Sequence, residues 1–110
     1  MSKKSLFNDF KSSAVDTPES VYVSPTGGIG TRIDSFTAAN NTGINGSYKA
    51  YIYASSGLPV SAVVPFKIVL RDRYDNAPSL INKVIPPGGS LRVESNVANG
   101  ISFTASGEDL

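Results

Sequence analysis

The sequence contains no histidine and no cysteine among its 110 residues. Histidine is the commonest general base near neutral pH and the commonest metal ligand, and cysteine supplies the thiolates of structural zinc sites. Ser-His-Asp and Cys-His catalytic sites and ordinary zinc sites are therefore excluded, and so is a disulfide framework. We expect no catalytic residues, no metal site and no cofactor.

The sequence also has little excess charge and no long apolar run. Ten basic residues against nine acidic ones give a net charge of +1, whereas nucleic-acid binding requires a markedly basic surface. The longest apolar run, residues 62–70, is interrupted by Pro65 and Lys67 and is far shorter than the ~18–20 residues of a membrane span. No apolar stretch follows Lys3 and Lys4, so we expect no secretory signal. Neither nucleic acid nor a membrane is an expected partner.

What the sequence does contain is short apolar segments separated by turns, as in the stretch "VIPPGGSLRVES" at residues 84–95. Two consecutive prolines exclude a helix or a central strand, and the two glycines after them tolerate positive φ. Pro-Pro-Gly-Gly is therefore a turn. Leu91 and Val93 then alternate with Arg92 and Glu94, which predicts a strand with one buried face and one solvent-exposed face.

The same pattern predicts an all-β fold of about seven strands. They fall at residues 20–23, 31–38, 47–54, 62–70, 79–85, 90–95 and 101–106. Strands at such intervals, without intervening helical patterns, indicate an antiparallel β-sandwich or jelly-roll-like domain, here residues 19–110. A chain of this length can form one hydrophobic core without stabilising disulfide bonds.

Alternation predicts which side of each strand faces the core. In segment 47–54 one face is expected to be buried and the other to carry Lys49, Tyr51 and Tyr53. In segment 62–70 the expected apolar face is Val64, Phe66, Ile68 and Leu70, with Pro65 marking a sheet edge or a bulge. In the last segment Ile101, Phe103 and Ala105 are expected to point inward.

Residues 1–18 differ from the rest and predict an extended N-terminal arm outside the core. Their only sizeable apolar groups are Leu6, Phe7, Phe10 and Val15. Ordering so many residues costs more free energy than these side chains recover against their own domain. We therefore expect a neighbouring subunit to hold the arm, with Leu6, Phe7 and Phe10 making the contacts.

Three features could form a binding or catalytic site, and a purely structural role explains each of them better. The stretch "TGGIGT" at 26–31 precedes a strand and lacks a lysine, so a turn is favoured over a phosphate loop. The stretch "RDRYDN" at 71–76 offers Asp72 and Asp75 but too few oxygens for a hard cation. A sugar-cleaving pair of carboxylates needs no histidine, but Glu94 lies beside Arg92 on the expected wet face.

Tyrosine and arginine outside the core favour binding to a partner. Tyr51 and Tyr53 share the outer face of one strand, and tyrosine is enriched at interfaces because its ring is apolar and its tip polar. That face is either part of an interface or covered by the arm or a loop. Arg71, Arg73 and Tyr74 in the 71–76 loop either dock on another chain or form a plain solvated loop.

Four runs together resemble small virion proteins of tailed bacteriophages: "VYVSPTGGIGTRIDSFTAANNTG" (21–43), "SYKAYIYASSG" (47–57), "INKVIPPGGSLRV" (81–93) and "ANGISFTASGEDL" (98–110). The resemblance spans residues 20–110, leaves out the arm, and consists of turn and core signals without catalytic residues. It implies a β-sandwich subunit of the virion, assembled in the host cytoplasm. Within that class a capsid decoration or cement protein is favoured.

Such a subunit would bind the major capsid protein or other virion proteins, with contacts between copies of itself in the particle. A neck, collar or tail component is the alternative within the class. A different alternative is a carbohydrate- or receptor-binding module, in which Tyr51, Tyr53 and Tyr74 would stack on sugars. A carboxylate hydrolase using Asp72 or Glu94 is the least favoured reading.

Overall fold

The computed structural model describes residues 3–57 and 59–110, and the side chains of these except 59–66. The described chain forms nine strands and one short 3-10 helix, η1. The strands are β1 (Lys4–Lys11), β2 (Glu19–Val23), β3 (Thr31–Asn40), β4 (Gly46–Tyr53), β5 (Pro59–Val69), β6 (Arg73–Asp75), β7 (Val84–Ile85), β8 (Ser90–Ser95) and β9 (Ile101–Asp109), and η1 is Pro78–Leu80.

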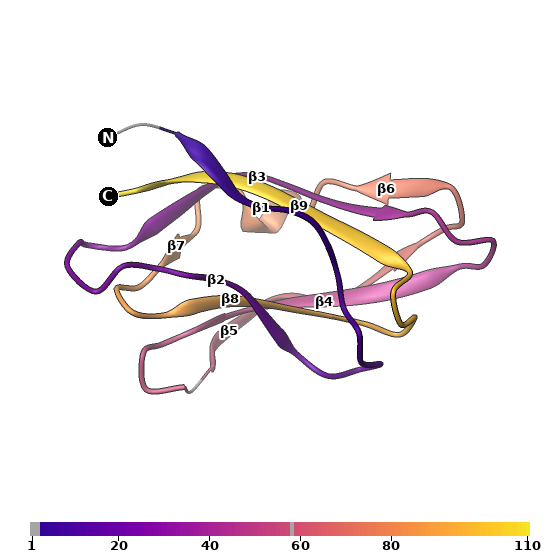
Figure 1. Cartoon of the computed structure of the whole chain (residues 1–110), viewed down its shortest axis with the longest axis horizontal. Helices are drawn as coiled ribbons and strands as arrows, with labels where there is room; N and C mark the ends of the chain where they lie inside the picture. The colour runs from indigo at the N-terminus through magenta and orange to yellow at the C-terminus, as the bar shows by residue number, and fades with distance from the viewer. Residues whose placement is uncertain (1–2, 58) are drawn as a thin grey trace.

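The strands form two antiparallel sheets packed face to face (Figure 1). The first sheet has the order β1-β9-β3-β6, with β7 also pairing with β3, and the second has the order β2-β8-β4-β5. The predicted all-β sandwich is confirmed, but it has nine strands instead of about seven. The additional strands are β1 and β6, and the segment expected to be one strand at 79–85 divides into the end of η1 and β7.

The leading segment is a strand of the sandwich, which corrects the expectation of a separate arm. β1 pairs with β9 along the edge of the first sheet, where Phe7 lies opposite Ala105 and Phe10 opposite Phe103. Leu6 is only 9% exposed and belongs to the core, while Phe7 and Phe10 pack against it. Two register shifts place an extra residue in β1 each time, so its apolar side chains depart from strict alternation.

A polar network fastens both ends of the chain across the two sheets. The Lys4 ammonium lies 2.5 Å from Oδ2 of Asp109. Oδ1 of the same carboxylate accepts hydrogen bonds of 2.7 Å from the hydroxyls of Tyr22 and Thr31. These groups come from β1, β2, β3 and β9. The Lys4 ion pair, followed by the two hydroxyl donors, lowers the pKa of Asp109 to about 2.

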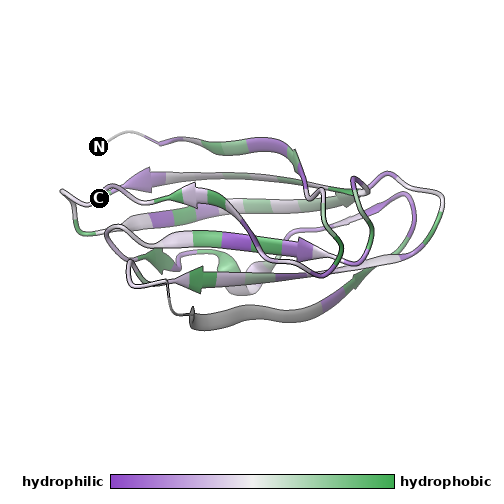
Figure 2. Cartoon of the chain, turned by 60° about the horizontal axis from the view of Figure 1, so that its bottom comes forward, coloured by the Kyte–Doolittle hydropathy of each residue, from purple (hydrophilic) through white to green (hydrophobic). Residues whose placement is uncertain are grey.

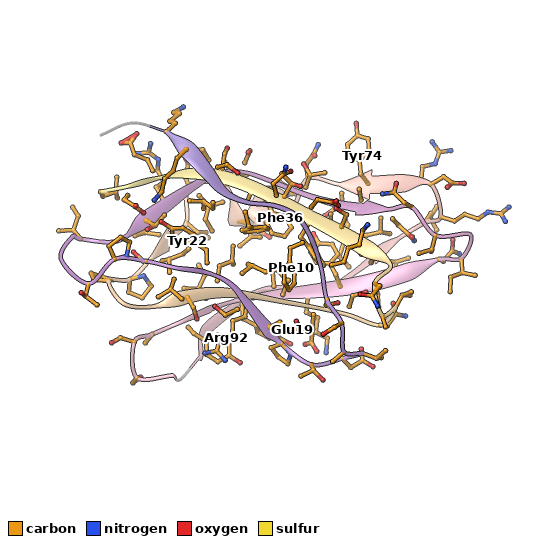
Figure 3. The ribbon with its side chains drawn as sticks, in the orientation of Figure 1. Phe10, Glu19, Tyr22, Phe36, Tyr74 and Arg92 are labelled. Carbon is orange, nitrogen blue, oxygen red and sulfur yellow. The ribbon has the colours of Figure 1, made fainter. Side chains whose placement is uncertain are left out.

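The core is built around three aromatic rings between the sheets. Phe36 stacks on Tyr48 with ring centroids 6.1 Å apart, and Phe103 contacts both rings at 6.0 and 5.7 Å. Phe7 of β1 adds an edge-on contact to Phe36 at 6.2 Å. Figure 3 places Phe36 and Phe10 between the two layers. Because such contacts are favourable beyond area burial, β1 contributes to the core and not only to the sheet edge.

Alternation predicted the buried faces of the central strands correctly. Figure 2 shows that apolar and polar residues alternate along these strands. The inward side chains of β4 and β9 are all buried, and these are Tyr48, Ala50, Ile52, Ile101, Phe103 and Ala105. The burial of both sets follows from the period-two geometry of a strand that has one face on a core.

The expected apolar face of residues 62–70 is wrong at its C-terminal end. Val69 is buried, whereas Ile68 and Leu70 are more than half exposed; the side chains of Val64 and Phe66 lie outside the described residues. β5 shows three register shifts against β4, each adding a residue to β5, and each such bulge reverses the alternation. Pro65 therefore lies in a bulged strand at a sheet edge, as expected for a residue without a backbone N–H.

The Pro-Pro-Gly-Gly segment forms the predicted turn into β8. Gly88 has φ of 72°, and the amide of Gly89 donates to the carbonyl of Pro86 at 2.8 Å. A Cβ on Gly89 would lie 2.3 Å from the backbone oxygen of Tyr53. Glycine is therefore required where the turn passes the end of β4, and this close approach helps to set β8 against β4.

Candidate interaction surfaces

Two neighbouring turns form one end of the sandwich, at the right of Figure 1. The carboxamide of Asn40 donates to the carbonyls of Ile44 and Val69, at 2.9 and 2.8 Å. The amide of Arg71 donates to Oδ1 of Asn45 at 3.1 Å. These bonds tie the β3–β4 turn to the end of β5, so the two turns lie next to each other at this end of the sandwich.

Exposed apolar, aromatic and basic side chains lie in these turns and on the strand ends next to them, and we call this set of residues the loop end. It comprises Ile44, Ile68, Leu70, Arg71, Arg73 and Tyr74. The four uncharged members are each more than half exposed, and both arginines are exposed. Tyr74 points away from the body in Figure 3. Arginine and tyrosine beside exposed aliphatic groups match the composition of interface cores.

The carboxylates of the 71–76 segment have separate roles. Asp75 accepts a 2.5 Å hydrogen bond from the Tyr48 hydroxyl and another from the amide of Ala77. Burial, followed by this bond to Asp75, raises the pKa of Tyr48. Asp72 is exposed and has φ of 58°. No three His, Cys, Asp or Glu side chains gather as a metal site would require in residues 3–57 and 59–110.

The outer face of the second sheet carries a second cluster, which we call the tyrosine face. It comprises Lys49, Tyr51 and Tyr53 of β4 and Arg92 and Glu94 of β8. In the register of the sheet Lys49 lies opposite Glu94, and Tyr51 lies opposite Arg92. The Arg92 guanidinium lies 4.1 Å from the centre of the Tyr53 ring, which is a cation–π distance. Figure 3 shows Arg92 on the opposite side of the molecule from Tyr74.

Glu94 is buried, which corrects the expectation that its side chain is exposed to solvent. It is 7% exposed, and its Oε1 accepts a hydrogen bond from the Tyr51 hydroxyl. Burial, followed by this bond to the carboxylate, raises the pKa of Tyr51 to about 12. The Tyr51 ring also meets Tyr53 edge-on, with centroids 6.2 Å apart. The carboxylate is thus held in one position by its neighbours across the strands.

An open groove of about 370 Å³ lies beside the tyrosine face. Its lining is polar apart from Tyr48, and consists of Asp16, Ser47, Tyr48, Lys49, Glu94, Ser95 and Asn96. Asp16 comes from the segment that joins β1 to β2. An isolated bridge between Val15 and Ser95, and a 2.9 Å hydrogen bond from the Asp16 amide to the Ser95 carbonyl, hold that segment against β8. The groove is therefore built from three parts of the chain.

The structure separates the residues that the sequence singled out. Tyr51 and Tyr53 lie together on the second sheet, whereas Tyr74 lies on β6 of the first sheet, so the three do not form one platform. Leu6, Phe7 and Phe10 pack on the chain's own core. Sequence reasoning missed the apolar part of the loop end. Its one available signal was an isoleucine at position 44, inside the turn-rich stretch "NNTGING".

A smaller apolar group lies at the opposite end of the sandwich. Val23, Ile29 and Val84 are exposed there, and their strands and turn meet near the last residue, because the amide of Ile29 donates to the Leu110 carbonyl. Arg32 lies opposite Val84 at this end, and its guanidinium pairs with the carboxylates of Asp34 and Glu108. This end therefore serves as an internal reference for experiments on exposed aliphatic side chains.

Comparison of the sequence with models of protein families, with curated proteins and with solved structures gave no match. Among the described residues no helix has the length and apolarity needed to cross a membrane.

Proposed function

We propose that this chain is a structural subunit of a tailed-phage particle that binds other virion proteins through its loop end. The loop end is the single observation that carries the proposal. Four uncharged side chains, Ile44, Ile68, Leu70 and Tyr74, are each more than half exposed there, and two arginines flank them. Exposed apolar groups gathered beside tyrosine and arginine are typical of protein-binding surfaces.

The sequence resemblance supplies the class of particle. Its runs at 21–43, 47–57, 81–93 and 98–110 resemble small β-sandwich virion proteins, and a non-catalytic role agrees with a chain lacking histidine and cysteine. Within the particle we favour capsid decoration, in which the loop end binds the major capsid protein. A neck, collar or tail position is the alternative.

The role of the leading segment differs from the one expected from the sequence. β1 already pairs with β9 and places Leu6 in its own core, so the reason for assigning it to a neighbour no longer applies. The proposal therefore rests on the loop end, and β1 serves to complete the first sheet.

A binding experiment with particles tests the proposal. Purified virions are first probed with an antibody against the chain, and immunogold labelling distinguishes the capsid from the neck or tail. Particles lacking the chain are then mixed with the purified protein and sedimented. The double variant Leu70→Ser, Tyr74→Ala should fold normally, because both side chains are exposed, but bind at least about tenfold more weakly.

Val84→Ser is the matched control, because it removes an exposed aliphatic group at the other end. It should bind as the unchanged protein does. The proposal is wrong if the chain is absent from virions, or if the double variant sediments with particles as well as the unchanged protein.

A further inference from the structure

We propose that the groove beside the tyrosine face binds a saccharide that carries no negative charge. This proposal uses no residue of the loop end, because the groove is lined by residues of β4 and β8, by Asn96 and by Asp16 of the segment that joins β1 to β2. Its volume of about 370 Å³ falls in the range of small-molecule sites, at roughly 300–1,000 Å³, and its open shape suits a ring bound against a sheet.

The charges of the groove select the class of ligand. Asp16 and Glu94 bring two carboxylates and Lys49 one ammonium, so the lining has a net charge of −1. A phosphate, sulfate or acidic sugar would meet two carboxylates in a small space and is disfavoured. A hydroxyl group both donates and accepts, so a sugar with neighbouring hydroxyls can satisfy carboxylates and an ammonium at once.

Several polar groups of the lining are available to such a ligand. Among the described residues the Lys49 ammonium has no ion pair, although Glu94 lies directly across from it. Asn96 uses its Oδ1 to accept from the amide of Ser47 at 2.8 Å, and its NH₂ group has no described acceptor. Lys49 and Asn96 therefore offer donors, and Asp16 and Glu94 offer acceptors, around one groove.

The site is held in position before any ligand arrives. The Tyr51 hydroxyl fixes the Glu94 carboxylate, and the Val15–Ser95 bridge fixes the segment that carries Asp16. Preorganisation of this kind lowers the entropic cost of binding.

A saccharide is favoured over a peptide from a partner protein. Apart from Tyr48, whose side chain is buried in the core, every lining residue is charged or polar. Peptide segments usually anchor through apolar or aromatic side chains that enter pockets, and the groove provides no apolar pocket for one. A ligand rich in hydroxyl groups matches the lining better.

The proposal is tested by adding sugars to the ¹⁵N-labelled protein and following its amide resonances. The panel contains glucose, galactose, N-acetylglucosamine and lactose as neutral probes, and glucuronic acid and sialyllactose as acidic probes. We expect at least one neutral probe at millimolar concentration to shift residues 47–51 and 94–96. The acidic probes should cause smaller shifts at the same positions.

Two variants and one control locate the binding. Glu94→Gln keeps the size of the side chain and Lys49→Ala removes the free ammonium, and each should weaken binding of the active probe about tenfold. Tyr74→Ala, on the other sheet, should bind as the unchanged protein does. Resonances outside the groove report whether each variant keeps its fold.

Three results would overturn the proposal. They are the absence of shifts with every sugar of the panel, equal binding by Glu94→Gln and Lys49→Ala, and stronger binding of the acidic sugars. A peptide from a virion partner that shifts residues 47–51 and 94–96 when no sugar does would also overturn it. The results with sugars do not test particle binding, which is measured with variants at the loop end.

Discussion

The variant Leu6→Ala tests whether β1 belongs to the core of its own chain. Leu6 is 9% exposed, and its Cδ1 lies 3.0 Å from the place where a Cβ would stand on Gly107, so it fills the space above a residue without a side chain. Burying a leucine side chain contributes about 1.5–3 kcal/mol, and truncation of buried leucines to alanine costs about 2–5 kcal/mol. The position is at a sheet edge, where neighbours can relax, so we expect about 2–3 kcal/mol.

The loss is measured by equilibrium unfolding in urea. The midpoint should fall while the slope stays constant, because the variant changes stability and not the surface exposed on unfolding. For a domain of this size the melting temperature should fall by about 4 °C per kcal/mol, or about 8–12 °C. Ser5→Ala is the control on the same strand, since Ser5 is exposed, and should stay within about 0.5 kcal/mol of the unchanged protein.

The outcome decides between a strand and a free arm. If Leu6→Ala destabilises the protein no more than Ser5→Ala does, residues 4–11 are not docked on this core and the reasoning about β1 fails. If the loss is large but the unfolding midpoint rises with protein concentration, β1 pairs with β9 of another copy. A large loss that is independent of concentration supports the pairing described above.

Two further predictions concern polar groups that join the sheets. Tyr48→Phe removes the hydrogen bond to Asp75 and should lower the free energy of unfolding by about 1–2 kcal/mol; an unchanged urea midpoint would contradict it. The pKa of Asp109 is lowered to about 2, below about 3.9 in the unfolded chain. Its stabilising effect is therefore complete above about pH 4–5 and is lost as the pH falls towards 2. Asp109→Asn, which weakens the Lys4 contact at every pH, should show a shallower loss of stability between pH 5 and 2.

The fold class could be predicted from the sequence because its signals are local. The turn at residues 86–89 follows from the backbone limits of proline and glycine. The buried side chains of β4 and β9 follow from period-two alternation. Both signals lie within a few residues, and the chain keeps them because each strand has one side on the core.

The missed features all depend on bulges or on contacts between distant segments. The extra residues in β1 and β5 reverse the alternation of inward and outward side chains. Strict alternation therefore does not identify Leu6 as a core residue, and it wrongly predicts that Ile68 is buried. Glu94 is buried, and its carboxylate accepts a hydrogen bond from Tyr51, 43 positions away in sequence. Such a pairing becomes visible only when β4 and β8 are set side by side.

By itself the sequence determined that this chain is an all-β protein without histidine or cysteine chemistry, in which Tyr51 and Tyr53 lie outside the core. Those properties depend on composition and on the geometry of a single strand. Only the tertiary structure decided that β1 completes the first sheet, that Tyr74 lies apart from the other two tyrosines, and that Asp16 reaches a groove with Lys49 and Glu94. The physical reason is that register and bulges determine which distant residues meet, and they depend on the packing of the whole sandwich.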